Sequence, residues 1–351
     1  MSVTAPPDQL GGPTVDPVVV DSVQGARGRA VKSFLEDIWR DKAATIGLLF
    51  LLILVFTAVF APLIAPYDPA AQSLADRLMP PSWMDGGSTS HLLGTDNLGR
   101  DVLSRLIYGG RVSLLVGSAV VAIAGTAGVL AGLFAGYRGG RTDTTIMRIV
   151  DTQVAFPGLL LALVILAVVG PSVSTVILVL SLNGWLVYAR VTRGAVLSVK
   201  QRGYVDAAEM VGAKSTRVVR RHIFPGITAP LITLAVLEFA RIILAEAALS
   251  FLGLGIQPPQ NSWGLDVAIG REYLFNAPWL VIFPGIAISL TVLSANMVAS
   301  WLRVRTNPLA REKRFAQDTM KHDLGSDGIL GSGDAFTDDM YAEETEGAAT
   351  L

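Results

Sequence analysis

Cysteine is absent from this chain of 351 residues, and charged residues make up only 16% of it. The lack of cysteine excludes disulfides, thiolate metal sites and cysteine nucleophiles. Hydrophobic residues make up 51% of the chain, and the mean hydropathy is +0.51. This balance is typical of a polytopic membrane protein and not of a soluble globular domain. The net charge of −1 indicates neither a polyanionic nor a polycationic partner.

The signatures of several enzyme classes are also missing. No phosphate-binding GxxxxGKS or GxxxxGKT sequence occurs, because none of the six lysines follows a glycine. The chain therefore cannot be a P-loop ATPase itself. The histidines His91, His222 and His322 are far apart, and none lies deep in an apolar stretch. We expect no metal site, no serine–histidine dyad in the membrane and no nucleic-acid partner.

Six long apolar stretches each predict a membrane-spanning helix. A helix that crosses ~30 Å of hydrocarbon at ~1.5 Å per residue needs about 20 apolar residues. The third stretch is short and is expected to extend backward through Val150. The sequence thus predicts an all-α polytopic membrane protein with six transmembrane helices, at about residues 45–65, 112–136, 156–169, 173–188, 229–251 and 278–302.

The positions of lysine and arginine predict the orientation. Basic residues cluster before the first stretch and after the second, fourth and sixth stretches. Because cytoplasmic loops carry an excess of Lys and Arg, we expect both termini in the cytoplasm. The expected organisation is a flexible tail over 1–44, a first helix over 45–66, an extracytoplasmic loop over 67–111, a five-helix core over 112–304 and a largely disordered acidic tail over 305–351.

The second half of the extracytoplasmic loop is expected to form an interfacial helix. Asp96 or Asn97 would cap it. Its apolar and polar residues separate onto two faces, which is typical of a helix lying on the membrane surface. The apolar face would consist of Leu98, Val102, Leu103, Leu106 and Ile107, and the polar face of Arg100, Asp101, Ser104 and Arg105.

Polar groups at membrane depth are candidates for a translocation path. Glu238 and Arg241 are three residues apart and can neutralise each other on one helix face, whereas Glu246 needs another partner. Glu246 either lines or gates the path or is a buried structural group. Asn183 and Asn296 complete the set.

A row of glycines in the second stretch predicts close helix packing. Gly128, Gly132 and Gly136 recur at every fourth position, so they share one helix face. Helices associate in lipid through van der Waals contact, which small residues permit at short range. The neighbouring helix could belong to this chain or to a second subunit.

Residues 204–226 read YVDAAEMVGAKSTRVVRRHIFPG and lie between long apolar runs. This polar and basic composition predicts a two-helix hairpin outside the lipid. Gly212 is expected to end the first helix, since glycine enters the left-handed conformation without strain. Ser215 is expected to cap the second helix and Pro225 to end it.

The hairpin resembles the EAA loop of ABC-importer permeases. Asp206 is followed by two alanines, then by a glycine four residues later and a proline at the end, although many members have Glu at the first position. In that family the loop docks in a groove of a separate ATPase subunit. The resemblance implies that the ATPase contacts Tyr204, Asp206, Ala207, Ala208, Glu209, Gly212, Arg217 and Pro225.

Two further segments resemble the same family. GTDNLGRDVLSRLIYGGRVSL, within residues 91–114, is similar to the segment before the second helix of dipeptide, oligopeptide and nickel permeases. LSFLGLGIQPP and the following SWG, within 249–264, resemble the segment between the last two helices. Since the three segments occur in family order, the chain resembles the C-type permease of this group, with a type I ABC importer permease fold.

The resemblance also implies partners. These are a second homologous permease, one or two ATPase subunits that bind ATP and Mg, and an extracytoplasmic substrate-binding protein or lipoprotein. The chain itself would bind no cofactor, would catalyse no reaction and would move peptides across the bacterial plasma membrane, surrounded by lipid. The residues Asp96, Arg100, Asp101 and Arg105 would either contact the binding protein or only orient the second helix.

Three alternatives remain open at this point. The same architecture could import nickel or another small solute. A self-sufficient secondary transporter would usually show an internal repeat of its spans, which we do not find. A membrane-embedded hydrolase would need paired catalytic groups at depth, and the fifth stretch offers carboxylates without a histidine.

Overall fold

The computed structural model describes residues 37–306, so most of the two tails predicted over 1–44 and 305–351 lies outside the described residues. The described part is helical and contains no β-strand. Its α-helices are α2 (Lys42–Val59), α3 (Ala61–Ile64), α4 (Val102–Arg138), α5 (Gly140–Val154), α6 (Gly158–Val169), α7 (Val173–Lys200), α8 (Gly203–Met210), α9 (Ser215–Val218), α10 (Phe224–Phe251), α11 (Trp263–Gly270) and α12 (Trp279–Thr306), with shorter turns η1 (Leu74–Asp76), η2 (Val219–Ile223) and η3 (Arg271–Tyr273).

Five of these helical segments are long and apolar enough to cross a membrane. They are α2, α4, α7, α12 and the continuous run Ser215–Phe251, which contains α10. The pair α5 and α6 makes a sixth if it is counted as one bent span. The prediction of an all-α polytopic membrane protein is therefore confirmed.

The third span is bent, and the prediction of one helix extended backward through Val150 is wrong. α5 and α6 meet at an angle of 79°. Pro157 stands at the junction as the residue before α6. Proline has no backbone N–H and disfavours helical geometry at the residue before it, so the helix cannot continue through this point.

The interfacial helix predicted in the extracytoplasmic loop is not a separate element. Its residues from Val102 onward form the first turns of α4, which continues unbroken for 37 residues, whereas Leu98, Arg100 and Asp101 precede the helix. The adjacent Gly109 and Gly110 lie inside this helix and do not break it. The lack of a side chain at both positions makes room for Trp263. A Cβ on Gly110 would lie 2.8 Å from Cζ2 of Trp263, whose Nε1 donates to the carbonyl of Leu106 at 2.8 Å.

The cap of α4 also differs from the prediction. Asp101, and neither Asp96 nor Asn97, precedes the helix and accepts a hydrogen bond from the backbone N–H of Ser104 at 2.8 Å. Asp96 instead accepts from the N–H groups of Leu98 and Arg100, at 2.8 and 2.9 Å. It therefore closes the turn that precedes the cap.

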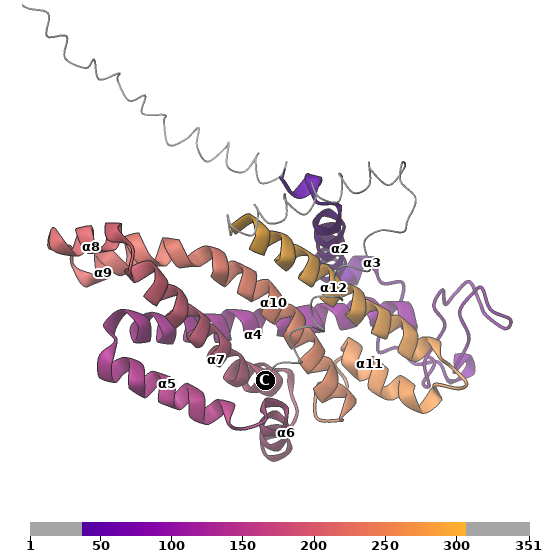
Figure 1. Cartoon of the computed structure of the whole chain (residues 1–351). Helices are drawn as coiled ribbons and strands as arrows, with labels where there is room; N and C mark the ends of the chain where they lie inside the picture. Colours follow the sequence, from indigo (N-terminus) through magenta and orange to yellow (C-terminus); the bar gives the residue numbers. More distant parts are fainter. Residues whose placement is uncertain (1–36, 307–351) are drawn as a thin grey trace, which may run out of the picture.

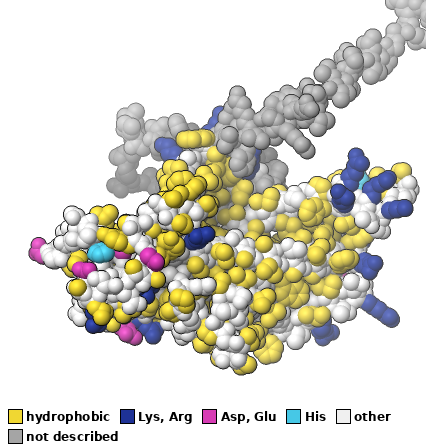
Figure 2. Space-filling model, turned by 180° about the vertical axis from the view of Figure 1, so that it is seen from behind, with side chains coloured by type: hydrophobic (Ala, Val, Ile, Leu, Met, Phe, Trp, Pro, Cys, Tyr) yellow, Lys and Arg dark blue, Asp and Glu magenta, His cyan; other side chains and the backbone are white. Residues whose placement is uncertain are grey.

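The helices form an elongated bundle (Figure 1). α8 and α9 lie at one end, while α11 and the loop of residues 65–101 lie at the other. α4 runs between these ends and packs along α7, and α12 packs against α2, α10 and α11. Hydrophobic side chains cover the middle of the surface, and charged side chains gather toward the two ends (Figure 2). This pattern suits a bundle whose middle lies in lipid.

The glycine row of α4 packs against α7 of the same chain. A Cβ on Gly128 would lie 2.3 Å from the carbonyl oxygen of Trp185, and one on Gly132 would lie 2.5 Å from that of Ala189. These distances leave no space for a side chain. The sequence left open which helix the row contacts, and the structure identifies it as α7.

Replacing Gly132 with leucine should destabilise the protein by at least about 1–3 kcal/mol, because the new side chain would push α4 away from the backbone of α7. Thermal unfolding in detergent measures this loss. Gly125→Ala is the matched control, since a Cβ there meets Tyr188 at an ordinary 3.5 Å. Equal melting temperatures for the two variants would contradict the assigned contact.

Candidate functional site

The predicted hairpin is present as α8, a glycine turn and a second helical segment. α8 ends where Gly212 takes a positive φ of 79°. The N–H of Gly212 donates to the carbonyl of Glu209, and that of Ala213 donates to the carbonyl of Ala208. The prediction that Gly212 ends the first helix is confirmed.

The second half of the hairpin differs from the prediction. Lys214, and not Ser215, precedes α9, and no side chain caps this helix. Pro225 does not end the helix, because it lies in the first turn of α10. Such positions tolerate proline, and the preceding η2 is a wider π-type turn that changes the local hydrogen-bond register. The hairpin therefore continues into a membrane span.

The hairpin presents an exposed face at its tip. Met210 and Val211 are 88% and 89% exposed, which is unusual for apolar side chains beside a folded turn. Ala208 is half-buried. The other residues predicted to contact an ATPase are exposed, namely Tyr204, Asp206, Ala207, Glu209, Gly212, Arg217 and Pro225.

The opposite face of the hairpin packs against the bundle. Val205 of α8 and Ile223 of η2 are fully buried in one apolar cluster with Val196 and Val199 of α7. Ile227 of α10 belongs to the same cluster. A displacement of the hairpin must therefore displace the adjoining ends of α7 and α10, because buried side chains of all three pack in this one cluster.

Polar contacts at the end of α4 reinforce this connection. The hydroxyl of Tyr137 lies 3.4 Å from Oε1 of Glu209. The Lys200 ammonium donates to the Tyr137 carbonyl at 3.0 Å and lies over the Tyr137 ring. The hairpin thus contacts three membrane helices, α4, α7 and α10.

The predicted intramembrane pair is confirmed. Arg241 donates through Nε and Nη2 to Oε2 of Glu238, at 2.9 and 2.6 Å. Glu238 is buried, whereas the side chain of Arg241 is 50% exposed on the outside of this chain. The pair therefore joins the interior of the bundle to a surface that could face a second subunit or a water-filled path.

Glu246 lies inside the chain and has three serine partners. Its Oε1 accepts from Ser250 and Ser262, each at 2.8 Å, and its Oε2 accepts from Ser113 at 3.2 Å. The residue is 1% exposed. These contacts join α4, α10 and the start of α11, which favours a structural role over direct lining of a path.

The two asparagines have different surroundings. Asn183 of α7 donates to the carbonyl of Gly158 at 3.2 Å, so it holds the start of α6 against α7. Asn296 of α12 is exposed on the outside of the chain. The structure therefore does not bring either asparagine together with Glu246 at one site.

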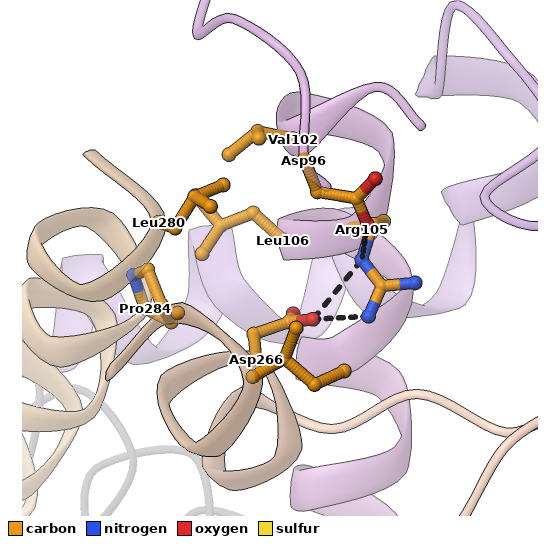
Figure 3. Close-up of a pocket in the computed structure, with 9 residues that line it drawn as sticks. Asp96, Val102, Arg105, Leu106, Asp266, Leu280 and Pro284 are labelled. Carbon is orange, nitrogen blue, oxygen red and sulfur yellow. Dashed lines mark hydrogen bonds and ion pairs between the residues drawn. The ribbon is translucent and has the colours of Figure 1, made fainter. Parts of the chain in front are cut away.

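Opposite the hairpin, the four residues predicted for an extracytoplasmic interface form a buried ionic network. Arg100 donates through Nε to Asp96 at 2.6 Å. Arg105 lies between two carboxylates, with its Nε 3.5 Å from Asp96 and 3.0 Å from Asp266 (Figure 3). Asp101 accepts from Ser104, and its Oδ1 lies 3.0 Å from His91 Nδ1.

Burial of this network favours the role of orienting α4 over contact with another protein. Burial raises the pKa of the Asp266 carboxyl, while the Arg105 guanidinium acts in the opposite direction. Asn261 supports both partners, since it accepts from Arg105 at 2.7 Å and donates to Asp266 at 3.1 Å. Removing one member of such a network leaves a buried charge without its counter-ion, which is costly.

The sequence did not indicate the partners of these buried groups. Asp266 pairs with Arg105 across 161 positions, and Ser113 reaches Glu246 across 133 positions. The only available signal was their proximity to the family-like segments at 91–114 and 249–264. Asp266 lies two residues after the second of these segments.

Glu246→Leu should lower stability by about 1–3 kcal/mol or more, because the serine hydroxyls would lose their buried acceptor. Glu246→Gln should cost less, since its amide retains an acceptor for Ser250 and Ser262 and can donate to Ser113. Thermal unfolding of the two purified variants gives the comparison. A leucine variant as stable as the glutamine variant would argue against the serine contacts.

The family described as "Binding-protein-dependent transport system inner membrane component" matches residues 128–311, more than half of the chain. The family described as "N-terminal TM domain of oligopeptide transport permease C" matches residues 32–81. The two matches include α2 and nearly all of the bundle from the middle of α4 onward.

Individual relatives agree with these matches. The chain is 47% identical over 282 residues to the dipeptide transport system permease protein DppC of Escherichia coli K12, covering 79% of this chain and 94% of the relative. It is 44% identical over 278 residues to the di/tripeptide transport system permease protein DppC of Pseudomonas aeruginosa, covering 79% and 92%. The family match over more than half of the chain agrees with these relatives and with the five or six membrane-spanning segments. The chain therefore belongs to the family of binding-protein-dependent transport system inner membrane components.

Proposed function

We propose that this chain is the permease subunit of an ATP-driven importer that carries short peptides across the bacterial plasma membrane. The hairpin of residues 204–226 carries this proposal, because it exposes one face and seals the other onto three membrane helices. The names of the relatives, which refer to dipeptides and to di- and tripeptides, favour peptides over nickel or another solute.

The proposed mechanism transmits force through the hairpin. A separate pair of ATPase chains binds ATP and Mg and approaches the exposed face of α8, where the small side chains of Ala207 and Ala208 permit close contact. Movement of the ATPases displaces the hairpin as a rigid unit. Because the hairpin shares a buried apolar cluster with α7 and α10, these two helices then move between two arrangements of the bundle.

The remaining partners follow from the same proposal. A second, homologous permease forms a heterodimer with this chain, and the half-exposed Arg241 lies on a surface available to it. An extracytoplasmic binding protein or lipoprotein delivers the peptide at the end that holds α11. The excess of basic residues around the hairpin supports a cytoplasmic location for that end and for both termini.

Proteoliposomes that contain the whole complex should accumulate a labelled dipeptide only when ATP is supplied on the side of the hairpin. The chain alone has no nucleotide-binding sequence, so vesicles that contain it alone should not accumulate the peptide. Accumulation by the isolated chain without ATP would contradict the proposal and favour a secondary transporter.

Gly212→Ala should reduce dipeptide uptake several-fold while ATP hydrolysis continues. A Cβ at Gly212 meets no atom within 4 Å, so the substitution acts only through its φ of 79°, which costs an L-residue about 1–2 kcal/mol. The turn should relax and α8 should lose its fixed angle. Uptake and hydrolysis are measured together in proteoliposomes.

Gly203→Ala provides the matched control for this experiment. It lies in the same hairpin, a Cβ there also meets no atom within 4 Å, and its φ is not positive. It should behave like the wild type in both assays. Unchanged uptake per ATP in the Gly212 variant would contradict a rigid hairpin.

A further inference from the structure

A cavity of about 650 Å³ lies at the end of the bundle opposite the hairpin. The first turns of α4, the start of α7, the loop after α10 and residues 69–72 form its walls. Its volume falls within the range of about 300–1,000 Å³ that is typical of small-molecule sites. The size suits a ligand such as a dipeptide or tripeptide.

Three arginines and no acidic residue line this cavity. They are Arg100, Arg105 and Arg111. The carboxylates of Asp96 and Asp266 bind Arg100 and Arg105 from outside the cavity lining, and they fix the positions of both guanidinium groups. Among residues 37–306, the charged groups that line the cavity are therefore all cationic.

The three arginines differ in how many of their donors are already used. Within residues 37–306, Arg100 uses its Nε, while its Nη groups form no hydrogen bond. Arg111 is exposed and has no ion pair or hydrogen bond to any residue in that range. Arg111 thus supplies a whole guanidinium, whose planar fork of donors matches the two oxygens of a carboxylate.

The rest of the lining is mainly apolar. Val112, Leu115, Val173 and the consecutive prolines Pro258 and Pro259 surround the arginines. Charge-assisted hydrogen bonds to a carboxylate are stronger than neutral ones, and the apolar walls suit apolar groups of the same ligand. A ligand with one carboxylate and adjoining apolar groups would satisfy both parts of this surface.

We propose that this cavity binds the C-terminal carboxylate of the transported peptide, with Arg111 as its principal ligand and Arg100 as a second donor. This inference rests on the proposed peptide import. The peptide's ammonium group finds no carboxylate in the cavity lining, so it points toward the opening. The bound peptide therefore has a defined direction, with its carboxyl end at the arginines.

The test measures binding of the dipeptide Ala-Leu and of its C-terminal amide to the membrane complex of permeases and ATPases in nanodiscs, without the binding protein, by saturation-transfer NMR. The amide lacks the negative charge but has nearly the same shape. For the wild type, Kd should be about tenfold lower for the acid than for the amide, since charge-assisted hydrogen bonds contribute more than neutral ones. Arg111→Gln should weaken binding of the acid about tenfold and remove most of this preference.

Arg77→Gln is the matched control. Arg77 is an exposed arginine in the loop at the same end, outside the cavity lining, and its substitution makes the same change in net charge. This variant should keep the preference for the acid. Arg111→Lys should keep part of it, because lysine retains the charge and loses the planar fork.

Two outcomes would overturn the inference while leaving peptide import intact. One is a wild-type complex that imports Ala-Leu but binds acid and amide equally well. The other is an Arg111→Gln complex that keeps the wild-type preference, which would indicate that the arginines contact an acidic group of a partner protein instead. A wild-type complex that imports no dipeptide when ATP is supplied would contradict the proposed function as well.

Discussion

The direct contact between the backbones of α4 and α7 is the constraint on which the rest of the bundle depends. Lipid tails are as apolar as leucine, so membrane helices gain little from hiding apolar side chains and must rely on close contact. The glycine row of α4 provides that contact, and larger side chains cannot occupy it. α4 has 37 residues and is therefore roughly 55 Å long. One continuous helix thus reaches from the arginine-lined cavity to the hairpin, and α7 holds it along much of this length.

Local patterns in the sequence predicted much of this architecture. The apolar stretches indicated the spans, Gly212 indicated the end of α8, and the spacing of Glu238 and Arg241 indicated their ion pair. Each of these features depends only on residues that are near one another in the sequence. The bend at Pro157 was missed because the apolar stretch continues on its far side, and composition alone does not distinguish a bent span from a short one. The wider turn before Pro225 was missed because a proline predicts a helix end more often than a helix start.

The candidate sites were less predictable, because their geometry depends on contacts between distant segments. The polar face at the start of α4 was expected at the membrane surface, since amphipathicity shows that two faces differ but not which one is buried. In the structure Arg105 and Ser104 lie inside, because Asp266 and Asn261 bind Arg105 and the backbone N–H of Tyr67 donates to the Ser104 hydroxyl. Glu246 was similarly known to need a partner, and its three serines come from α4, α10 and the residue before α11. Periodicity within one helix cannot identify such partners.

The arrangement of charge at the cavity end has a further consequence for transport. A permease must bind its solute weakly enough to release it, so a deeply buried and fully hydrogen-bonded cation would be a poor ligand. Arg100 and Arg105 are already paired with carboxylates, which reduces the positive charge they present. Arg111 keeps its full charge but is exposed to solvent, which weakens each contact it makes. Both features limit the affinity of the cavity for an anion. α4 also contacts Glu209 of the hairpin through Tyr137, so one continuous helix joins the hairpin to the end of the bundle that holds Arg111.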